Sequence, residues 1–154
     1  MKFSILALVA ATAVSAAPAP PALGLDVVFQ ARNFSASCVP HSAMCFYSFN
    51  AFQPGTMDTL GYNCTASGVA GWDNGPALPE IQGGTCLPSS RTFDVVRTKK
   101  GLEITVSVQV SRLSYTRGSH LIPNRQIKMI KGVTPTGDYQ AYVGPKDFDL
   151  KRVD

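Results

Sequence analysis

The side chains of this sequence that could do chemistry are two histidines, four cysteines and ten carboxylates. Hydrolases often mark their sites with a Gly-x-Ser-x-Gly elbow or a His-Glu-x-x-His helix, and the sequence contains neither pattern, nor a phosphate-binding loop. Four carboxylates could supply a pair of the glycosidase type: Asp58, Asp73, Glu80 and Asp138. Solvated turn residues explain these positions equally well. We therefore expect a protein that is not an enzyme, with a hydrolase as the weaker alternative.

Neither a metal ion nor a cofactor is expected. The alternative is a Ca²⁺ site near the C-terminus, if the fold gathers Asp138, Asp147 and Asp149 with loop carbonyl groups. His120, in an Arg-Gly-Ser-His stretch, is most simply interpreted as a loop residue. No set of chemical residues in the sequence therefore demands catalysis.

The start of the chain predicts export. Lys2 precedes an apolar run over residues 3–14 and small residues follow, so that residues 1–16 have the pattern of a secretory signal peptide. The apolar run is well short of the roughly 20 residues that a membrane span needs. Residues 17–24 are an Ala/Pro-rich leader, and residues 25–154 are predicted to form a single β domain. We expect a secreted monomer without a membrane span.

The cysteines predict two disulfides, because export is oxidising and the cysteine count is even. They are Cys38, Cys45, Cys64 and Cys86. Three pairings are open, and we favour Cys38–Cys45 with Cys64–Cys86, the sequential arrangement that closes two local loops. His41 creates a Cys-x₂-His-x₃-Cys spacing, which matches no common zinc finger and argues against zinc.

An N-glycosylation sequon is consistent with export. Asn33-Phe34-Ser35 has the Asn-x-Ser pattern, which predicts a surface position and makes Asn33 the candidate glycosylation site. A second formal sequon begins at Asn63, but a disulfide at Cys64 would compete with glycosylation there.

The strongest structural signal is a β-hairpin within residues 91–111. Apolar residues alternate with polar ones without interruption from Leu102 to Ser111, which predicts a strand with one buried and one solvent-facing side. A second strand, residues 92–98, precedes it. Lys99-Lys100-Gly101 would form the turn, in which glycine can take a positive φ.

The rest of the chain predicts further short strands at spacings typical of all-β proteins. They are expected within residues 25–34, 43–52, 60–65, 125–131 and 138–143, and residues 112–122 and 146–150 also carry apolar residues among polar ones. No segment keeps a helical period for three turns. The predicted fold class is all-β, an antiparallel β-sandwich or flattened β-barrel of seven to eight short strands.

Basic residues concentrate around the hairpin. Residues 91–131 contain nine Lys and Arg but only two Asp and Glu. If the sheet makes these side chains converge, the basic face would attract an acidic protein, an anionic polysaccharide or lipid headgroups. The alternative is a set of solvated strand edges. Arg97, Lys99, Lys100 and Arg112 are the candidate binding residues of this region.

Residues 68–84 are rich in Gly and Pro and are expected to lack a regular element. They contain Trp72, the single tryptophan. In one interpretation Trp72 folds back as a lid on one end of the core. In the other, Trp72 is an exposed aromatic platform for a sugar or a protein partner, which makes it a further candidate binding residue.

The overall layout and one short stretch resemble a known family. A signal, four cysteines and a Trp/Gly/Pro loop before the longest amphipathic strand lead to the closing sequence of residues 142–150, Tyr-Val-Gly-Pro-Lys-Asp-Phe-Asp-Leu. Together these features resemble the small secreted fungal proteins of the Alternaria major-allergen-like family. The chain is most similar to the branch of elicitors that induce a hypersensitive response in plants.

The resemblance implies a compact β-sandwich or β-barrel without known catalysis, which acts as a virulence-related effector in the host apoplast. It implies recognition by a plant extracellular or cell-surface protein, such as a thaumatin-like defence protein, followed by cell death and defence responses. The allergen itself carries an extra cysteine for a covalent dimer, from which the even count here departs. No family motif assigns binding residues. The alternative is a secreted carbohydrate- or small-ligand-binding module that uses Trp72.

Overall fold

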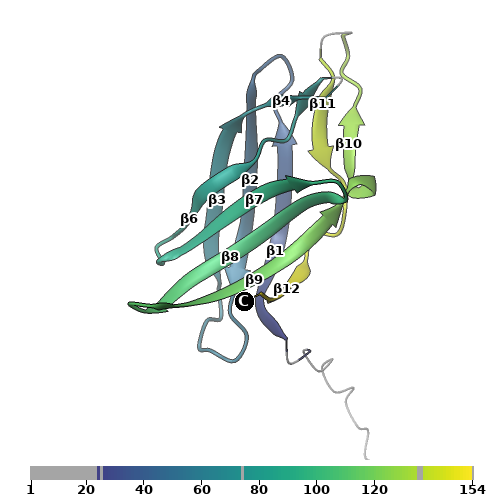
Figure 1. The fold of residues 1–154 in the computed structure, drawn as a ribbon. Coiled ribbons are helices and arrows are strands. Elements are labelled where there is room, and N and C mark those ends of the chain that lie inside the picture. Colours follow the sequence, from purple (N-terminus) through teal and green to yellow (C-terminus); the bar gives the residue numbers. More distant parts are fainter. Residues whose placement is uncertain (1–23, 25, 74, 135–136, 154) are drawn as a thin grey trace, which may run out of the picture.

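The computed structural model describes residues 24, 26–73, 75–134 and 137–153 (Figure 1). The predicted signal peptide and all of the predicted leader except Gly24 lie outside these residues. In the described part, every regular element is a β-strand apart from one short 3₁₀ turn, η1 (Asn124–Gln126). The strands are β1 (Val27–Cys38), β2 (Met44–Phe52), β3 (Tyr62–Val69), β4 (Gly71–Trp72), β5 (Pro76–Ala77), β6 (Ile81–Leu87), β7 (Arg91–Thr98), β8 (Gly101–Ser111), β9 (Ser114–Pro123), β10 (Ile127–Ile130), β11 (Tyr139–Tyr142) and β12 (Phe148–Arg152).

Eight of these strands close into an antiparallel barrel. The hydrogen-bonded order is β1-β12-β9-β8-β7-β6-β3-β2, and β2 pairs back onto β1. β10 and β11 extend the sheet from the far half of β1, where Ser37 lies opposite Ala141. The prediction of an all-β flattened barrel is confirmed. The described residues contain more strands than the seven to eight predicted, and two of them, β4 and β5, lie in a stretch that was expected to lack a regular element.

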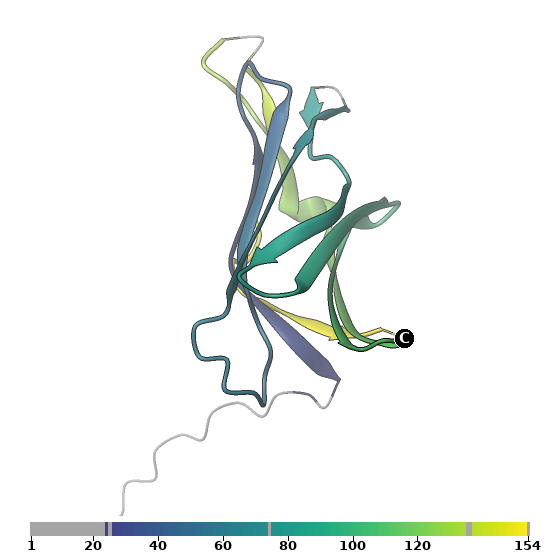
Figure 2. The ribbon, with the colours of Figure 1, turned by 90° about the vertical axis from the view of Figure 1, so that its left-hand side faces the viewer.

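The barrel is flattened into two layers. Figure 2 shows β1, β2 and β3 as one layer and the strands from β6 to β9 as the other. Alternating side chains of each layer point inward, and on β2 Cys45, Tyr47, Phe49 and Ala51 are all fully buried. The alternation arises because successive residues of a strand face opposite sides. Each large apolar side chain buried in this way contributes about 1.5–3 kcal/mol to stability.

Aromatic rings join the two layers at the centre of the core. The ring of Phe49 on β2 packs edge-on against Phe93 on β7, with centroids 5.0 Å apart. Phe34 on β1 lies 5.8 Å from Phe49 and 5.2 Å from Phe148 on β12. The Phe49–Phe93 and Phe34–Phe148 pairs are edge-to-face, and such pairs stabilise beyond their buried area by about 0.5–1.5 kcal/mol each.

Both predicted disulfides are present in the structure. Cys38–Cys45 joins facing residues of β1 and β2, and Cys64–Cys86 joins facing residues of β3 and β6. The sequential pairing is therefore confirmed. The second bridge spans 22 residues and fixes the connection in which residues 70–80 leave the barrel wall and return to it.

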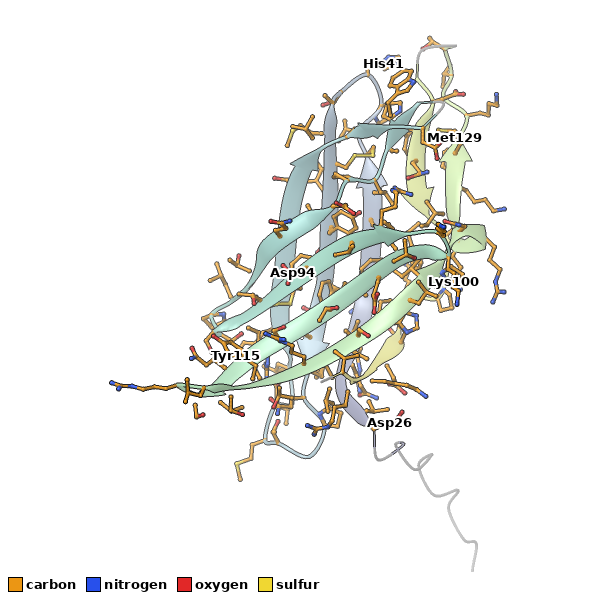
Figure 3. The ribbon with its side chains drawn as sticks, in the orientation of Figure 1. Asp26, His41, Asp94, Lys100, Tyr115 and Met129 are labelled. Carbon is orange, nitrogen blue, oxygen red and sulfur yellow. A yellow bond between two sulfur atoms is a disulfide. The ribbon has the colours of Figure 1, made fainter. Side chains whose placement is uncertain are left out.

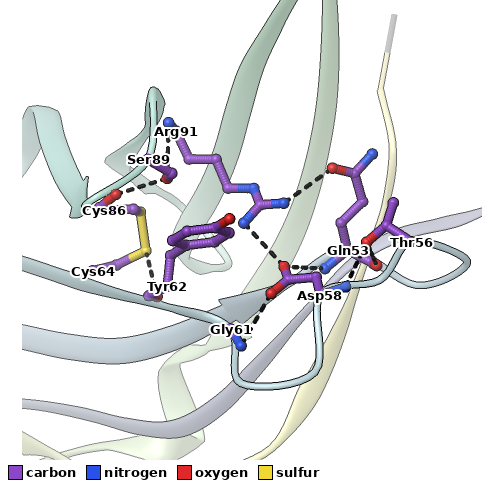
Figure 4. Close-up of polar contacts among 9 residues, drawn as sticks. All are labelled: Gln53, Thr56, Asp58, Gly61, Tyr62, Cys64, Cys86, Ser89 and Arg91. Atoms are coloured by element: carbon purple, nitrogen blue, oxygen red, sulfur yellow. Dashed lines mark hydrogen bonds and ion pairs between the residues drawn. A yellow bond between two sulfur atoms is a disulfide. The ribbon is translucent and has the colours of Figure 1, made fainter.

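A buried ion pair closes one end of the barrel (Figure 4). The Arg91 guanidinium donates to the Asp58 carboxylate over 3.0 Å and to the Gln53 side-chain oxygen over 3.1 Å. It also stacks 4.3 Å above the Tyr62 ring. Asp58 in turn accepts a hydrogen bond from the Gly61 amide, so the loop between β2 and β3 is held against the barrel end. Arg91 is buried and does not belong to the predicted basic face.

Several predicted strand boundaries are wrong. β1 starts at Val27 and runs on to Cys38, and an irregularity in its pairing with β12 between Val27 and Phe29 lets both Val28 and Phe29 point inward. Residues 68–84 were expected to lack regular structure. They instead hold the end of β3, the short β4–β5 pair and the start of β6, because glycine and proline at such positions do not prevent edge pairing.

The predicted hairpin of β7 and β8 is confirmed, with its turn at Lys99 and Lys100. A Cβ atom on Gly101, which has φ 151°, would collide with the Ile122 carbonyl oxygen, so glycine is required there. The prediction of a buried edge reaching Val110 is wrong. β7 accompanies β8 only as far as Ser107, and Val110 is 58% exposed.

This geometry predicts that the same substitution at two valines of β8 has a large effect on stability at one and almost none at the other. Val106 is fully buried, so Val106→Asp places an unpaired charge in the core and should lower the free energy of unfolding by more than about 3 kcal/mol. Val110→Asp is the matched control and should change it by less than about 0.5 kcal/mol. Urea denaturation of both variants measures the difference. Equal stabilities would contradict the described packing.

Candidate functional site

The segment of residues 76–80, which we call the strap, bridges the two layers at the end of the barrel opposite Arg91. The Leu78 amide donates to the Gln140 side chain of β11 over 2.8 Å, and the Leu78 carbonyl accepts from the Arg97 guanidinium of β7 over 2.7 Å. The Tyr47 hydroxyl of β2 donates to the Pro79 carbonyl over 2.8 Å. The Leu78 side chain is fully buried, so the strap plugs the core at this end.

Trp72 lies beside the strap and points into solvent. Its strand β4 pairs with β5, with Trp72 opposite Pro76. The side chain is 83% exposed, so the interpretation of Trp72 as a lid on the core is wrong. The geometry agrees with the other interpretation, an exposed aromatic surface. The short strands explain the exposure of Trp72. β4 and β5 have two residues each, so the pair has no further side chains that could pack against the indole and bury it.

A pocket of about 430 Å³ opens between Trp72 and the strap. Its side chains include the carboxylates of Asp73 and Glu80 and the guanidinium of Arg97, with Leu78 and Pro79 among the strap residues that line it. The structure thus brings together two of the sequence-predicted candidates, Trp72 and Arg97. We call this set the Trp72 pocket. An aromatic face beside charged donors and acceptors suits a polar ligand with one apolar side, such as a sugar.

Arg97 is both a pocket residue and a support of the strap. One guanidinium nitrogen is committed to the Leu78 carbonyl and lies 3.4 Å from the Gln140 side-chain oxygen, and the others remain available to a ligand. Its backbone amide donates to Glu80 over 2.8 Å. Burial raises the pKa of the Tyr47 phenol well above its ordinary value, and the positive charge of Arg97 opposes that rise.

The basic residues do not form one face. Lys99 and Lys100 follow Arg97 after one residue, Thr98, and Asn124 holds their turn through bonds to both of their carbonyl groups. Arg112 lies beyond the other end of β8, which has eleven residues, so that roughly 35 Å of strand separate it from Lys100. The interpretation in which the basic side chains converge is therefore wrong, because an extended strand places the two ends of the basic stretch far apart.

A continuous row of uncharged hydroxyl groups crosses the outer surface of the sheet, and the hairpin carries two acidic residues, Asp94 and Glu103, between this row and the Lys99–Lys100 turn. Neighbouring strands present the hydroxyl groups in register: Ser35, Ser48, Thr65, Thr85, Thr92 and Ser107. Cross-strand hydroxyl pairs stabilise a sheet modestly. The polar side of the hairpin is consequently no basic surface, and the charged candidates lie at its two ends.

The four carboxylates considered for catalysis are dispersed. Asp73 and Glu80 line the Trp72 pocket, where Glu80 already accepts the Arg97 amide. Asp58 is paired with Arg91 on the opposite end of the barrel, and Asp138 lies 3.6 Å from Lys131. Two of the four carboxylates, Asp73 and Glu80, therefore share one site, the Trp72 pocket.

The three aspartates proposed for Ca²⁺ do not gather. Asp147 accepts the Asn33 amide over 2.9 Å, and Asp149 accepts the Gln30 side chain over 3.0 Å. Asp138 caps the Gly132 amide on another part of the sheet. Among the described residues there is no cluster of three or more potential metal ligands.

Asn33, the candidate glycosylation site, is exposed. It has φ 54° and lies where the pairing of β1 with β2 is interrupted, between Arg32 and Ser35. Its backbone amide is held by Asp147, and no hydrogen bond of its side chain is found in the described residues. Glycosylation of Asn33 remains a prediction.

His120 is a strand residue and not the loop residue that was predicted. It lies on β9 opposite Ile104, stacks 4.2 Å from the Phe148 ring, and its Nδ1 lies 3.0 Å from the Asp149 carbonyl oxygen. Partial burial lowers the pKa of the imidazole below its ordinary 6.5, and the Asp149 contacts only partly offset that effect. His120 therefore acts in packing.

The lowered pKa of His120 predicts a pH-dependent stability. The unfolded chain takes up a proton on this residue near pH 6.5, before the folded chain does, so the stabilisation is present above about pH 6.5 and is lost as the pH falls through the lower folded pKa. The urea concentration at the midpoint of unfolding should decrease as the pH is lowered from about 7.5 to about 5.5. His120→Gln, which does not titrate, should flatten this slope. An identical slope in both proteins would contradict the assignment.

The pairing of the strap with β11 and β7 could not be recognised from the sequence. Gln140, Leu78 and Arg97 are far apart along the chain, and no local pattern links them.

In the described residues, no helix has the length and apolarity to cross a membrane. Comparison of the chain with protein-family models, with curated proteins and with solved structures found no match.

Proposed function

We propose that this protein is a secreted fungal elicitor that plants recognise in the apoplast, through binding of a host extracellular or cell-surface protein. Its signal-like start, its resemblance to elicitors of the hypersensitive response and its two disulfides support this proposal, since disulfides are typical of proteins that leave the cell. A thaumatin-like defence protein is the first partner to test. The protein acts as a monomer and by binding, not by catalysis.

The exposed Trp72 beside Arg97 is the observation that carries the proposal. Tryptophan and arginine are the side chains most enriched among residues that dominate the affinity of protein interfaces. Here the indole is presented on a β4–β5 pair that is separate from the barrel wall, and Arg97 is positioned by its bond to the strap. A large aromatic surface left in water has no role in folding, so its burial by a partner is a source of binding energy.

Trp72→Ala should therefore weaken partner binding without weakening the fold. We expect at least a tenfold lower affinity for the partner captured from plant apoplastic fluid, with a matching reduction of leaf necrosis and oxidative burst. The melting temperature should be unchanged, because the indole is 83% exposed. Leu60→Ala is the control, since Leu60 is 85% exposed on the loop at the opposite end of the barrel. Full activity of Trp72→Ala would remove the pocket from the recognition surface.

The Trp72 pocket also favours a second candidate, a module that binds a carbohydrate or another small polar ligand. Its volume of about 430 Å³ lies in the range of small-ligand sites. The indole offers a face on which a sugar ring can stack, and Asp73, Glu80 and Arg97 offer hydrogen-bonding groups around it. This candidate requires no host protein.

The single tryptophan makes the second candidate directly measurable. Titration with plant and fungal cell-wall oligosaccharides should shift or quench Trp72 emission and saturate, because no other indole contributes to the signal. Asp73→Ala should lower the affinity for a saccharide that changes the Trp72 emission in this way. Glu103→Ala, which removes a carboxylate from the outer face of β8, is the control and should not. Unchanged emission with every saccharide would leave the elicitor as the better explanation of the pocket.

A further inference from the structure

A second exposed surface lies on the hairpin of β8 and β9, away from the Trp72 pocket. Beyond Ser107 on β8 the described pairing with β7 ends, and β12 is in register with β9 at Gly118 and Ser119, with a further bond from the Val153 amide to the Arg117 carbonyl at the base of the arm. Residues 108–117 therefore form a two-stranded arm, which extends past the neighbouring strands in Figure 1. We call it the β8–β9 arm.

The end of the arm exposes two aliphatic side chains to solvent. Arg112 and Leu113 form its turn between the paired Ser111 and Ser114, and Leu113 is 97% exposed. Val110 precedes the turn at 58% exposure, at an irregularity in the pairing. A soluble hairpin usually has polar residues at such a tip. Leucine at this position is therefore unexplained by folding.

Arginines surround this apolar tip. Arg112 is part of the turn, and Arg117 lies 5.3 Å from the ring of Tyr115, which Figure 3 labels on the arm. Arg152 of β12 joins Leu113, Tyr115 and Arg117 around a hollow of about 270 Å³. The sequence contains no Asp or Glu from 104 to 137, so the arm itself carries no negative charge. Asp26, whose backbone carbonyl accepts the Arg152 amide over 2.7 Å, is paired through its side chain with Lys151 over 3.3 Å.

We propose that the β8–β9 arm is a docking site for membranes that contain anionic lipids. Leu113 and Val110 enter the interface between headgroups and acyl chains, and the arginines contact lipid phosphates. The arm is convex and its most exposed side chain is at its extreme tip, which suits insertion into a soft lipid surface better than contact with a protein of fixed shape.

The spacing along the arm fits the depth of a lipid interface. Four residues of strand separate Leu113 from Arg117, which is about 13 Å at 3.3 Å per residue. An apolar side chain buried by about 5–10 Å leaves Arg117 and Arg152 near the charged surface, within one Debye length of it. Tyr115 lies between them, and tyrosine is enriched at this level of membranes. The long arginine side chains can extend toward phosphates while their stems stay on apolar surface.

Sedimentation of the secreted chain with lipid vesicles tests this proposal. We expect binding to phosphatidylcholine vesicles that contain about 30% phosphatidylserine, weak binding to pure phosphatidylcholine, and loss of binding when NaCl is raised from about 0.1 to about 0.5 M. Leu113→Asp should lower partitioning at least tenfold, and Arg112→Gln and Arg117→Gln about fivefold each. Met57→Asp is the control, because Met57 is 99% exposed on the loop between β2 and β3, outside the arm.

A fluorescent variant locates the contact. Leu113→Trp in a Trp72→Phe background leaves one indole at the tip, and its emission should shift to the blue with anionic vesicles. The parent protein, with Trp72 alone, should show no such shift. Unchanged melting temperatures establish that the variants fold, since all of the altered side chains are exposed.

Three results would overturn the proposal. The first is absence of sedimentation with every vesicle composition, and the second is equal loss of binding in Leu113→Asp and Met57→Asp. The third is dimerisation of the free protein that Leu113→Asp abolishes while vesicles stay unbound, which would make the arm an interface between copies of the chain. Trp72→Ala should retain vesicle binding, so failure of the elicitor proposal and failure of this one are distinguishable.

Discussion

Closure of the barrel through β1 is the constraint on which the rest of the structure depends. One edge of β1 pairs with β2 over nearly its whole length, and the other edge pairs first with β12 and then with β11. A sheet that closes in this way gives each strand of the ring a neighbour on both sides, which reduces the edge surface through which β-proteins aggregate. It also fixes the register of every strand, because a slip of one residue would turn the inward side chains outward.

A closed wall leaves two open ends, and the chain fills them by different means. One end is held by the Arg91–Asp58 pair and the stacked Tyr62 ring. Removal of one partner would leave an uncompensated buried charge, so this interaction holds the loop strongly. The other end is filled by Leu78 of the strap, tied to β2, β7 and β11 through hydrogen bonds. The same bonds place Arg97 next to Trp72, so the candidate site is a consequence of how the barrel is plugged.

The surface outside the barrel divides into regions of different character. The Trp72 pocket combines an indole with both signs of charge, the β8–β9 arm combines apolar side chains with arginines, and the row of hydroxyl groups between them is neutral. The barrel keeps the pocket and the arm apart on one rigid body. The two surfaces that are proposed to bind partners therefore lie on separate parts of the barrel.

The sequence alone determined the class of fold, the hairpin and the covalent links. Alternation from Leu102 to Val106 and the even cysteine count are local or compositional signals, and both were interpreted correctly. The same alternation misled at Val110, because a strand keeps its period after the neighbouring strand has ended. Only the tertiary structure decided which strands meet, that the basic residues separate and that Trp72 faces solvent beside Arg97. Those facts depend on pairing between residues far apart in the chain, and such pairing leaves no periodic trace in either partner.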